Sequence, residues 1–557
     1  MSRARFPAIF IVLVVVLTAC PGKNEPKPSR PPVRSATPAV GARGGTLRVL
    51  LTQDVDAIDP QRAGAPASFG LARAMHRGLM AFASAAGADG AAVVPDLAET
   101  PPEVSADGRR YTFHLREGIA FGAPASRPVR AADVKAGLER IFTARSPFSR
   151  YFTVIAGADA MAVGRANSLS GVAAPDERTV VIALVRPAND FLSLLALPAA
   201  SAVPPGLAPT ARPKDIAPSG PYRLATDDGY VPERSIHLVR NDAWDEGTDT
   251  VRLAYVDEIK YEIDSDPDDI VRRIASGRAH LAGDALPPGT ATGAIAADRV
   301  IREPHACLRY LFINTRIAPF TSGRVRAAVA QAVDRAAVAA TYGPAPAAAP
   351  GSTILPPTVA GFDPNRAVPT ADAAAARKTL NDARYGSGFA TRLVVGDTNI
   401  DRAQASAVRA ALARAGIRVT ISVVPIASVY EDYYEVPAAK VPMGIATWCA
   451  DWPGPGGRGS LQQLVDGRRV APRGGTNYSG LNDTALNRAM DAASSESDQA
   501  KAAAAWLAAD RRAVGSAAVV PLAYPAELSL LAATVRGFVP HPYFVRGDLT
   551  AVWLSPS

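Results

Sequence analysis

The sequence of 557 residues is poor in cysteine, histidine and tryptophan, with three, six and five of these residues. The six histidines are scattered and show no metal-ligand spacing, which argues against the common histidine-based metal sites. The chain also has no apolar run of the roughly 20 residues that a membrane-spanning helix needs. The net charge of +8 is dispersed, without a dense basic stripe interleaved with aromatic residues. No nucleic-acid partner is therefore expected.

Motifs of common enzymes are missing too. The sequence contains no Gly-x-Ser-x-Gly elbow, no His-Glu-x-x-His and no phosphate loop ending in Gly-Lys-Ser/Thr. Asp264, Asp266 and Asp268 begin like a calcium loop, and we interpret them as a solvated loop. The reason is that Asp269 stands where the turn glycine is required and Ala275 where the closing glutamate is required. The sequence thus predicts no enzyme, no metal and no cofactor.

What is present first is a secretory signal. Arg3 and Arg5 precede an apolar run over residues 9–17, which ends in Leu-Thr-Ala-Cys at Cys20. A short apolar run with a basic flank and small residues at its end is typical of a signal peptide, here residues 1–19. The ending resembles a bacterial lipobox, which implies lipid on Cys20 as the new first residue. The alternative is an ordinary signal peptide followed by an unrelated cysteine.

Residues 20–43 follow as a stalk between Cys20 and the globular body. Six prolines lie here among lysines and arginines, with almost nothing apolar to bury. Such a segment cannot offset the entropy of ordering and is expected to be extended and flexible. We therefore expect a lipid, a stalk and then a body that starts at about Gly44.

The body reads as an α/β protein, because strand and helix patterns alternate along it. Expected strands cover residues 44–51, 111–116, 179–184, 235–240, 258–263, 308–314, 393–396 and 419–424. Expected helices cover 68–82 with Ser68 as N-cap, 129–142, 268–276, 325–333 and 402–415. Joints rich in proline and glycine lie at 204–221 and 343–370.

Two cysteines remain once Cys20 is set aside. Cys307 and Cys449 could pair in an oxidising compartment, or they could be two unrelated buried thiols. The residues alone leave this open.

The most informative stretch surrounds Asp451, which lies between Trp448 and Trp452 and is followed by a glycine-rich loop. The two tryptophans could be core residues, with Asp451 as a turn or helix cap. The functional alternative is a pocket in which Asp451 binds a cationic group while the indoles exclude water.

At these residues the chain resembles the extracytoplasmic solute-binding proteins of the peptide/nickel type, which serve ABC importers. The likeness runs from about Gly44 to Val552 and consists of motifs in the family's order. These motifs are Gly44-Gly45-Thr46-Leu47, Ile58-Asp59-Pro60, residues 111–118 and 129–134, Ser219-Gly220-Pro221-Tyr222, residues 240–244, Asn314-Thr315, Pro319-Phe320, residues 324–326, Asp334-Arg335, Val520-Pro521-Leu522 and Gly537-Phe538.

The stretch 448–451 is similar to the oligopeptide-binding branch in particular. That resemblance implies that Asp451 binds the α-ammonium of a peptide and that Cys449 is bridged to Cys307. It places Trp448, Trp452, Cys449, Ala65 and Tyr478 among the substrate-binding residues. The chain departs from the pattern in Trp452 and in the glycine-rich turn after it. The segment 64–67 also lacks the polar residues often found there.

The resemblance further implies a two-lobed, type II periplasmic-binding-protein-like fold. Lobe I would consist of residues 44–80, 203–306 and 522–557, with domain II inserted at 81–202 and lobe III at 307–521. A monomer would capture peptides between the lobes and deliver them to an ABC permease with separate ATPase subunits, while its lipid anchor holds it at the extracytoplasmic face of the membrane. Alternatives are another family solute (nickel chelate, haem, opine or sugar), or a secreted enzyme or receptor on the same scaffold.

Overall fold

The computed structural model describes residues 41–226, 229–287, 289–304, 306–544 and 546–556. The predicted signal peptide, the lipidation site Cys20 and the stalk up to residue 40 lie outside the described residues.

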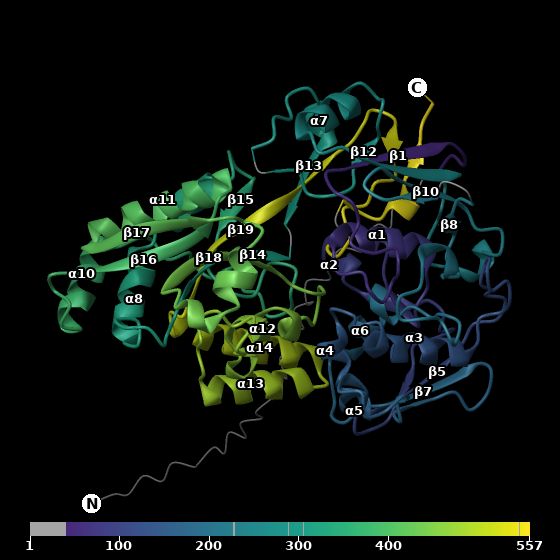
Figure 1. Cartoon of the computed structure of the whole chain (residues 1–557), viewed down its shortest axis with the longest axis horizontal. Helices are drawn as coiled ribbons and strands as arrows, with labels where there is room; N and C mark the ends of the chain where they lie inside the picture. Colours follow the sequence, from purple (N-terminus) through teal and green to yellow (C-terminus); the bar gives the residue numbers. More distant parts are fainter. Residues whose placement is uncertain (1–40, 227–228, 288, 305, 545, 557) are drawn as a thin grey trace, which may run out of the picture. The chain divides into compact units, whose positions relative to one another are not determined.

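The first of three main sheets has six strands in the order β12-β1-β11-β10-β8, with β9 on β10 (Figure 1). Its strands are β1 (Thr46–Leu51), β8 (Tyr222–Leu224), β9 (Tyr230–Val231), β10 (Ser235–Arg240), β11 (Glu258–Ile263) and β12 (Leu281–Ala282). β1 runs parallel to both β11 and β12, whereas β10 is antiparallel to its neighbours. Helices α1 (Pro66–Met75) and α7 (Pro267–Ala275) pack into the same core. We call this part lobe I.

The second sheet has four antiparallel strands in the order β4-β5-β7-β6. They are β4 (Glu103–Val104), β5 (Arg110–His114), β6 (Val172–Ala173) and β7 (Thr179–Ala183). Alternate residues of β5 and β7 are buried, as expected for a sheet with one covered face. The covering helices are α3 (Ala131–Thr143), α4 (Ser149–Phe152), α5 (Ala158–Ala162) and α6 (Phe191–Leu195). We call this part domain II; the pair β2 (Met80–Phe82) and β3 (Val93–Pro95), with α2 (Gly87–Gly90) between them, precedes it.

The third sheet has seven strands in the order β13-β19-β14-β18-β16-β17, with β15 on β19. Its strands are β13 (Val300–Pro304), β14 (Cys307–Ile313), β15 (Ala348–Pro350), β16 (Phe389–Gly396), β17 (Ile417–Val424), β18 (Met443–Cys449) and β19 (Val519–Leu530). Every residue of β14 is buried, because helices cover both faces of the sheet there. Those helices are α8 (Gly323–Ala332), α9 (Arg335–Ala340), α10 (Ala373–Asp382), α11 (Asn399–Arg414), α12 (Leu461–Val465), α13 (Thr484–Ser495) and α14 (Gln499–Gly515). We call this part lobe III.

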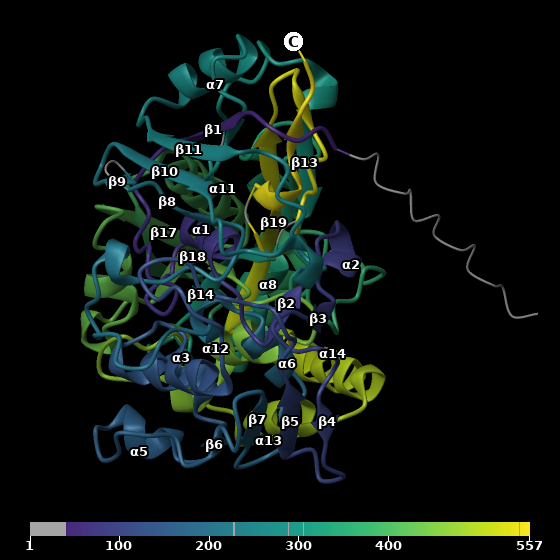
Figure 2. The same cartoon turned by 90° about the vertical axis from the view of Figure 1, so that its right-hand side faces the viewer.

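A two-stranded ribbon links lobe III to lobe I. The first half of β19 pairs with β14, its second half pairs with β13, and Leu531 then bridges to Leu281 of β12. β19 therefore passes from one large sheet to the edge of the other (Figures 1 and 2). We call β13 and residues 526–530 of β19 the hinge ribbon. The strands of the three sheets define these parts, and the residue limits given for the lobes above stay predictions.

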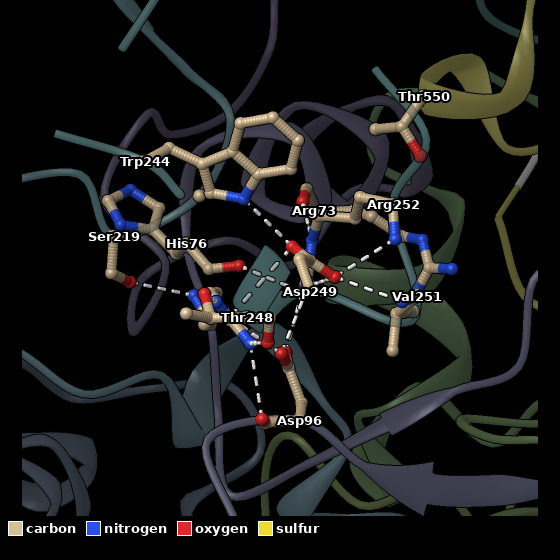
Figure 3. A network of polar contacts seen from close by, with 12 residues as sticks. Arg73, His76, Asp96, Ser219, Trp244, Thr248, Asp249, Val251, Arg252 and Thr550 are labelled. Atoms are coloured by element: carbon tan, nitrogen blue, oxygen red, sulfur yellow. Dashed lines mark hydrogen bonds and ion pairs between the residues drawn. The ribbon is translucent and has the colours of Figure 1, made fainter. Parts of the chain in front are cut away.

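A buried ionic network links residues that follow α1 and β3 to the segment 244–252 (Figure 3). The Arg252 guanidinium donates to Asp96 at 2.8 Å and to Asp249 at 3.2 Å, and the Trp244 indole donates to Asp249 at 3.0 Å. Arg77 donates to Asp96 at 2.7 Å. Since each carboxylate meets at least two donors, the desolvation cost of burying these charges is offset.

The expected strands and helices are confirmed to within a few residues, with one exception. The helix expected over 68–82 with Ser68 as N-cap is wrong: α1 covers Pro66–Met75 and has Ala65 at its N-cap position. It begins early because Asp56, rather than Ser68, accepts from the backbone N–H groups of Gly64 and Ala65. It ends early because the Met75 carbonyl accepts from the backbone of residues 219 and 220, at 3.0 and 2.8 Å. The first contact comes from a residue eight positions before Gly64 and the second from a distant segment, and neither belongs to the helical pattern itself.

Candidate functional site

A cavity of about 610 Å³ lies between lobe I, the hinge ribbon and lobe III. Lobe I contributes Asp54, the α1 start at Ala65–Ala67 and the loop after β12. Lobe III contributes Tyr342, Pro344 and the cysteines Cys307 and Cys449. The volume is within the usual range of ligand sites, about 300–1,000 Å³. This cavity is the candidate ligand site.

A second cavity, of about 490 Å³, lies on the opposite face of the hinge ribbon. Side chains alternate across a strand, so Glu303 and Arg302 point to opposite faces of β13. Arg302 and Leu528 line the first cavity, whereas Glu303 and Ser529 line the second. The hinge ribbon thus lies between the two cavities, with Glu527 and Arg546 lining both. Of these two cavities, the first is the one lined by Ala65 and Cys449.

The cavity wall formed by Cys449 offers main-chain hydrogen-bonding groups. Ala450 donates to the Ala306 carbonyl at 2.8 Å, so Cys449 opposite Cys307 is a non-hydrogen-bonded pair whose N–H and C=O point away from β14. On that other side β16 pairs with β18 only at Met443 and Gly444. In the described part of the chain, the edge of β18 at Cys449 is therefore open to a ligand.

The two cysteines of this wall are bonded to each other in the structure. The bridge spans 142 residues of sequence and links the facing ends of β14 and β18. It therefore fixes the edge at which β18 faces the cavity.

Three carboxylates and two guanidiniums of the described residues line the candidate site: Asp54, Asp284, Glu527, Arg302 and Arg546. Asp284 and Arg546 are 7% and 3% exposed. Arg546 donates from Nε to the Asp284 carbonyl at 2.7 Å and also to the Leu528 carbonyl. The side chain of Arg546 thus ties the loop after β12 to the hinge ribbon.

Asp451 is not among the residues that line this cavity. The Tyr151 hydroxyl of domain II donates to Asp451 Oδ2, and Arg150 Nη2 lies 3.5 Å from the same oxygen. Burial raises the pKa of Asp451 to about 6, although Arg150 and the Tyr151 hydroxyl oppose this shift. The structure therefore gives Asp451 two partners from its own chain.

Trp452 and Arg458 of lobe III also contact domain II. Trp452 is fully buried in the core of domain II, edge-on to Tyr151 at a centroid distance of 4.7 Å. Arg458 makes a bidentate ion pair with the buried carboxylate of Asp190, with both distances 2.8 Å, and donates to the Tyr151 carbonyl at 3.2 Å. The turn that follows Asp451 therefore packs against domain II and forms an ion pair with it.

The glycine-rich turn has a packing reason. A Cβ atom at Gly457 would lie 2.2 Å from the Trp506 ring, and one at Gly459 would lie 3.1 Å from the Trp452 ring. Both glycines are therefore needed where the turn passes between two buried indoles. The glycine-rich turn therefore matches the bulk of both Trp452 and Trp506.

The remaining two predicted binding residues lie inside lobe III. Trp448 donates from Nε1 to the Gly459 carbonyl at 3.0 Å and packs against the lobe III core. Tyr478 packs edge-on against Phe312, with centroids 5.6 Å apart, in an aromatic cluster of that core. Of the six predicted residues, the cavity therefore brings together Ala65 and Cys449.

Sequence reasoning missed Arg150, Tyr151, Asp190, Arg458 and Asp284. None of them belongs to a recognisable motif, and each is defined by a partner far away in the sequence. No local signal could have found them.

The acidic run taken as a solvated loop has a helix-capping role. Asp266 is the N-cap of α7 and accepts from Asp268 N at 2.9 Å. Within the described ranges, no group of three or more histidine, cysteine or acidic residues could hold a metal ion. In the same part of the chain, no helix combines the length and the apolar character that crossing a bilayer requires.

The fold and the cavity between its lobes define a solute-binding protein of the two-lobed α/β class. Residues 92–462 match the bacterial extracellular solute-binding proteins, family 5, middle region, and the chain belongs to this family. This confirms the family and the fold class expected from the sequence motifs. Family 5 proteins are the solute-binding components of ABC importers.

Solved structures agree with this assignment. The chain is 29% identical to clavulanic acid biosynthesis oligopeptide binding protein 2, with a TM-score of 0.83, covering 93% of this chain and 97% of that one. The fold also matches DppA of Helicobacter pylori in complex with the peptide STSA, at 22% identity and a TM-score of 0.72, over 92% and 99% of the two chains.

Among characterised relatives, the chain is 27% identical to the glutathione-binding protein GsiB of Salmonella typhi over 373 residues. That match covers 64% of this chain and 65% of GsiB, slightly less than two thirds of its length. The proteins named here are binding proteins rather than enzymes.

Proposed function

We propose that this chain is the peptide-capturing lipoprotein of an ABC importer. It binds peptides in the cavity of about 610 Å³ between lobe I and lobe III and delivers them to a membrane permease with separate ATPase subunits. Binding returns the ligand unchanged, so the protein acts as a receptor and not as a hydrolase.

The observation that carries this proposal is the open edge of β18 in the cavity wall. A peptide lying along Cys449 can exchange main-chain hydrogen bonds with it, as an added strand does at a sheet edge. Main-chain recognition is indifferent to side chains and suits varied peptides. Sugars and metal chelates have no peptide groups to match this edge.

Glutathione is the second candidate ligand, because the relatives GsiB are named for it. It is itself a tripeptide with one γ-linked bond, so it has fewer main-chain groups in register for a strand edge. We therefore rank α-linked peptides above glutathione as the expected ligand, and the experiment below includes both.

The test is to incubate the purified full chain with a tripeptide pool, glutathione, a sugar mixture and nickel–histidine, then identify the retained ligand by mass spectrometry. Intact α-linked peptides are the expected result. Retention of glutathione alone would move the assignment to the second candidate, and a sugar or chelate would overturn the peptide assignment. Recovery of cleaved peptides would show an enzyme.

We further propose that Cys20 carries the lipid that holds the protein at the extracytoplasmic face of the membrane. A freely diffusing receptor would be lost from a cell without an outer membrane, which is the reason for a tether. The Cys20→Ala variant is expected to appear in the medium on fractionation of cells. A variant that stays with the membrane would contradict the tether.

A further inference from the structure

Asp284, one of the described residues that line the cavity, has a carboxylate oxygen that the protein leaves without a partner. Asp284 Oδ2 accepts from the backbone N–H and the hydroxyl of Thr52, at 2.9 and 2.6 Å. Asp284 Oδ1 is buried and has no hydrogen-bond partner. An unpartnered buried carboxylate oxygen costs free energy, which a donor on a ligand could recover.

The nearest cation in the cavity is already committed. Arg546 donates from Nε to the Asp284 main-chain carbonyl and from Nη1 to the Leu528 carbonyl. Its Nη1 also lies 3.3 Å from Glu527 Oε1. No ion pair joins the side chains of Arg546 and Asp284 in the described residues. The charge of Asp284 is therefore not neutralised by direct contact.

The neighbouring acid on the same wall serves as a contrast. Asp54 accepts from the Tyr230 hydroxyl at 2.9 Å and from Glu233 N at 2.8 Å through one oxygen, and from Val55 N through the other. Both of its oxygens are used in holding loops of lobe I. Asp284 thus differs from Asp54 in retaining an unused acceptor.

The carboxylate of Asp451, unlike that of Asp284, is surrounded by positively charged side chains. Arg150 and Tyr151 already contact its carboxylate, and Arg469 lies close enough to affect its pKa. Arg458 is matched by Asp190. An ammonium group would meet the guanidiniums of Arg150 and Arg469 near Asp451, whereas at Asp284 the nearby guanidinium of Arg546 is hydrogen-bonded to main-chain carbonyls and does not contact the carboxylate.

We infer that Asp284 binds the ammonium group of the ligand in this protein. This inference rests on the proposed peptide function and names the residue that reads the charged end of the peptide. The ammonium donates to Oδ1 while Oδ2 stays on Thr52, so the carboxylate becomes fully satisfied. Asp451 keeps its contacts with Arg150 and Tyr151.

The test uses two degenerate tripeptide libraries, one with free amino termini and one N-acetylated. Their retention by the full chain and by its variants is measured by equilibrium dialysis and mass spectrometry. Asp284→Asn keeps the shape and the Thr52 contact but removes the charge, and it should weaken binding of free-amine peptides about tenfold or more with little effect on acetylated ones. Asp159→Asn makes the same chemical change on the exposed surface of domain II and should alter neither library.

Asp284→Glu keeps the charge and should keep part of the preference for free amines, which separates lost recognition from lost folding. Asp451→Asn should lower the retention of free-amine and acetylated peptides by similar factors. A preference for free amines that survives Asp284→Asn but disappears in Asp451→Asn would overturn the inference and leave the peptide function intact. Retention of neither library by the unmodified chain would overturn the peptide function itself.

The libraries also distinguish the source of the ammonium. Acetylated peptides that are retained only when they contain lysine, and lost in Asp284→Asn, would place a side-chain ammonium at Asp284. Free-amine peptides retained whatever their side chains would place the α-ammonium there.

Discussion

Single carboxylates in this protein are held in environments that change how they titrate, and Asp510 of α14 is a clear case. Its side chain is fully buried and Oδ1 accepts from Ile354 N and Leu355 N, at 2.7 and 3.0 Å. Oδ2 has no hydrogen bond and lies 3.7 Å from Arg366 Nη1. Burial raises the pKa of Asp510 to about 6, although the two backbone donors oppose the shift.

Asp510→Asn should therefore change the pH dependence of stability. The folded chain takes up a proton at Asp510 below about pH 6, whereas the unfolded chain does so only near pH 4, so this residue makes the free energy of unfolding fall as pH rises from 4 to 6. The contribution is up to about 3 kcal/mol, at 1.36 kcal/mol per pKa unit. Urea unfolding is measured at pH 4.5 and pH 7. The free energy of unfolding of the variant should rise relative to that of the unmodified chain as pH rises. A difference between the variant and the unmodified chain that stays constant with pH would contradict this account.

The same scale shows why sequence reasoning reached only part of the site. Asp451 stands out between two tryptophans, so its importance is visible in the sequence. Its partner Arg150 lies some 300 residues away, and nothing in its neighbours distinguishes it from other surface arginines. Asp284 is distinguished by a buried oxygen without a hydrogen bond, which is a property of the packed structure alone.

At the scale of elements, local patterns were sufficient wherever an element is held by its own amphipathic face. The helix predicted from Val325 and Val329 forms as α8 with both residues fully buried. The pattern failed for α1, whose two ends are set by Asp56 and by residues 219–220. Because both partners lie outside the helix, the limits of α1 cannot be determined from its own residues.

The link between β14 and β18 gives a prediction at this scale. In the chain-entropy picture, a bridge across 142 residues stabilises the fold by up to about 5 kcal/mol. The Cys307→Ser/Cys449→Ser double variant should therefore unfold at a clearly lower urea concentration, by roughly 2–5 kcal/mol in free energy.

Thiol labelling provides the control for this measurement. The unfolded, unreduced protein should expose no thiol from Cys307 or Cys449, and two after reduction. Labelling of both cysteines without reductant would show that they remain free thiols, and equal stability of the double variant would then follow.

At the scale of the whole binding unit, the lobes are joined in two different ways. The hinge ribbon is a continuous pair of hydrogen-bonded strands. It can bend while its strand pairing stays intact. The contact between domain II and lobe III instead depends on side chains, above all the buried pair of Arg458 and Asp190. Main-chain contacts support it, since Asn189 N donates to the Ser494 carbonyl at 3.0 Å. Opening of the cavity would break the second contact and spare the first.

Asp190→Asn should consequently shift the ligand-free protein towards an open form. The substitution leaves the Arg458 guanidinium buried without its counter-ion, at a cost of about 3–5 kcal/mol that is relieved when the lobes separate and water reaches it. Small-angle X-ray scattering should give a larger radius of gyration for the variant, with saturating peptide restoring the value of the unmodified chain.

Affinity should fall in proportion to the loss of the closed population, because the ligand must now supply the free energy of closure. Asp215→Asn removes a partly exposed partner of Arg212 and serves as the matched control, with no change expected in radius of gyration or affinity. If Asp190→Asn lowers the melting temperature while the radius of gyration stays unchanged, the pair only stabilises the folded chain. Closure would then be governed by the hinge ribbon and the ligand alone.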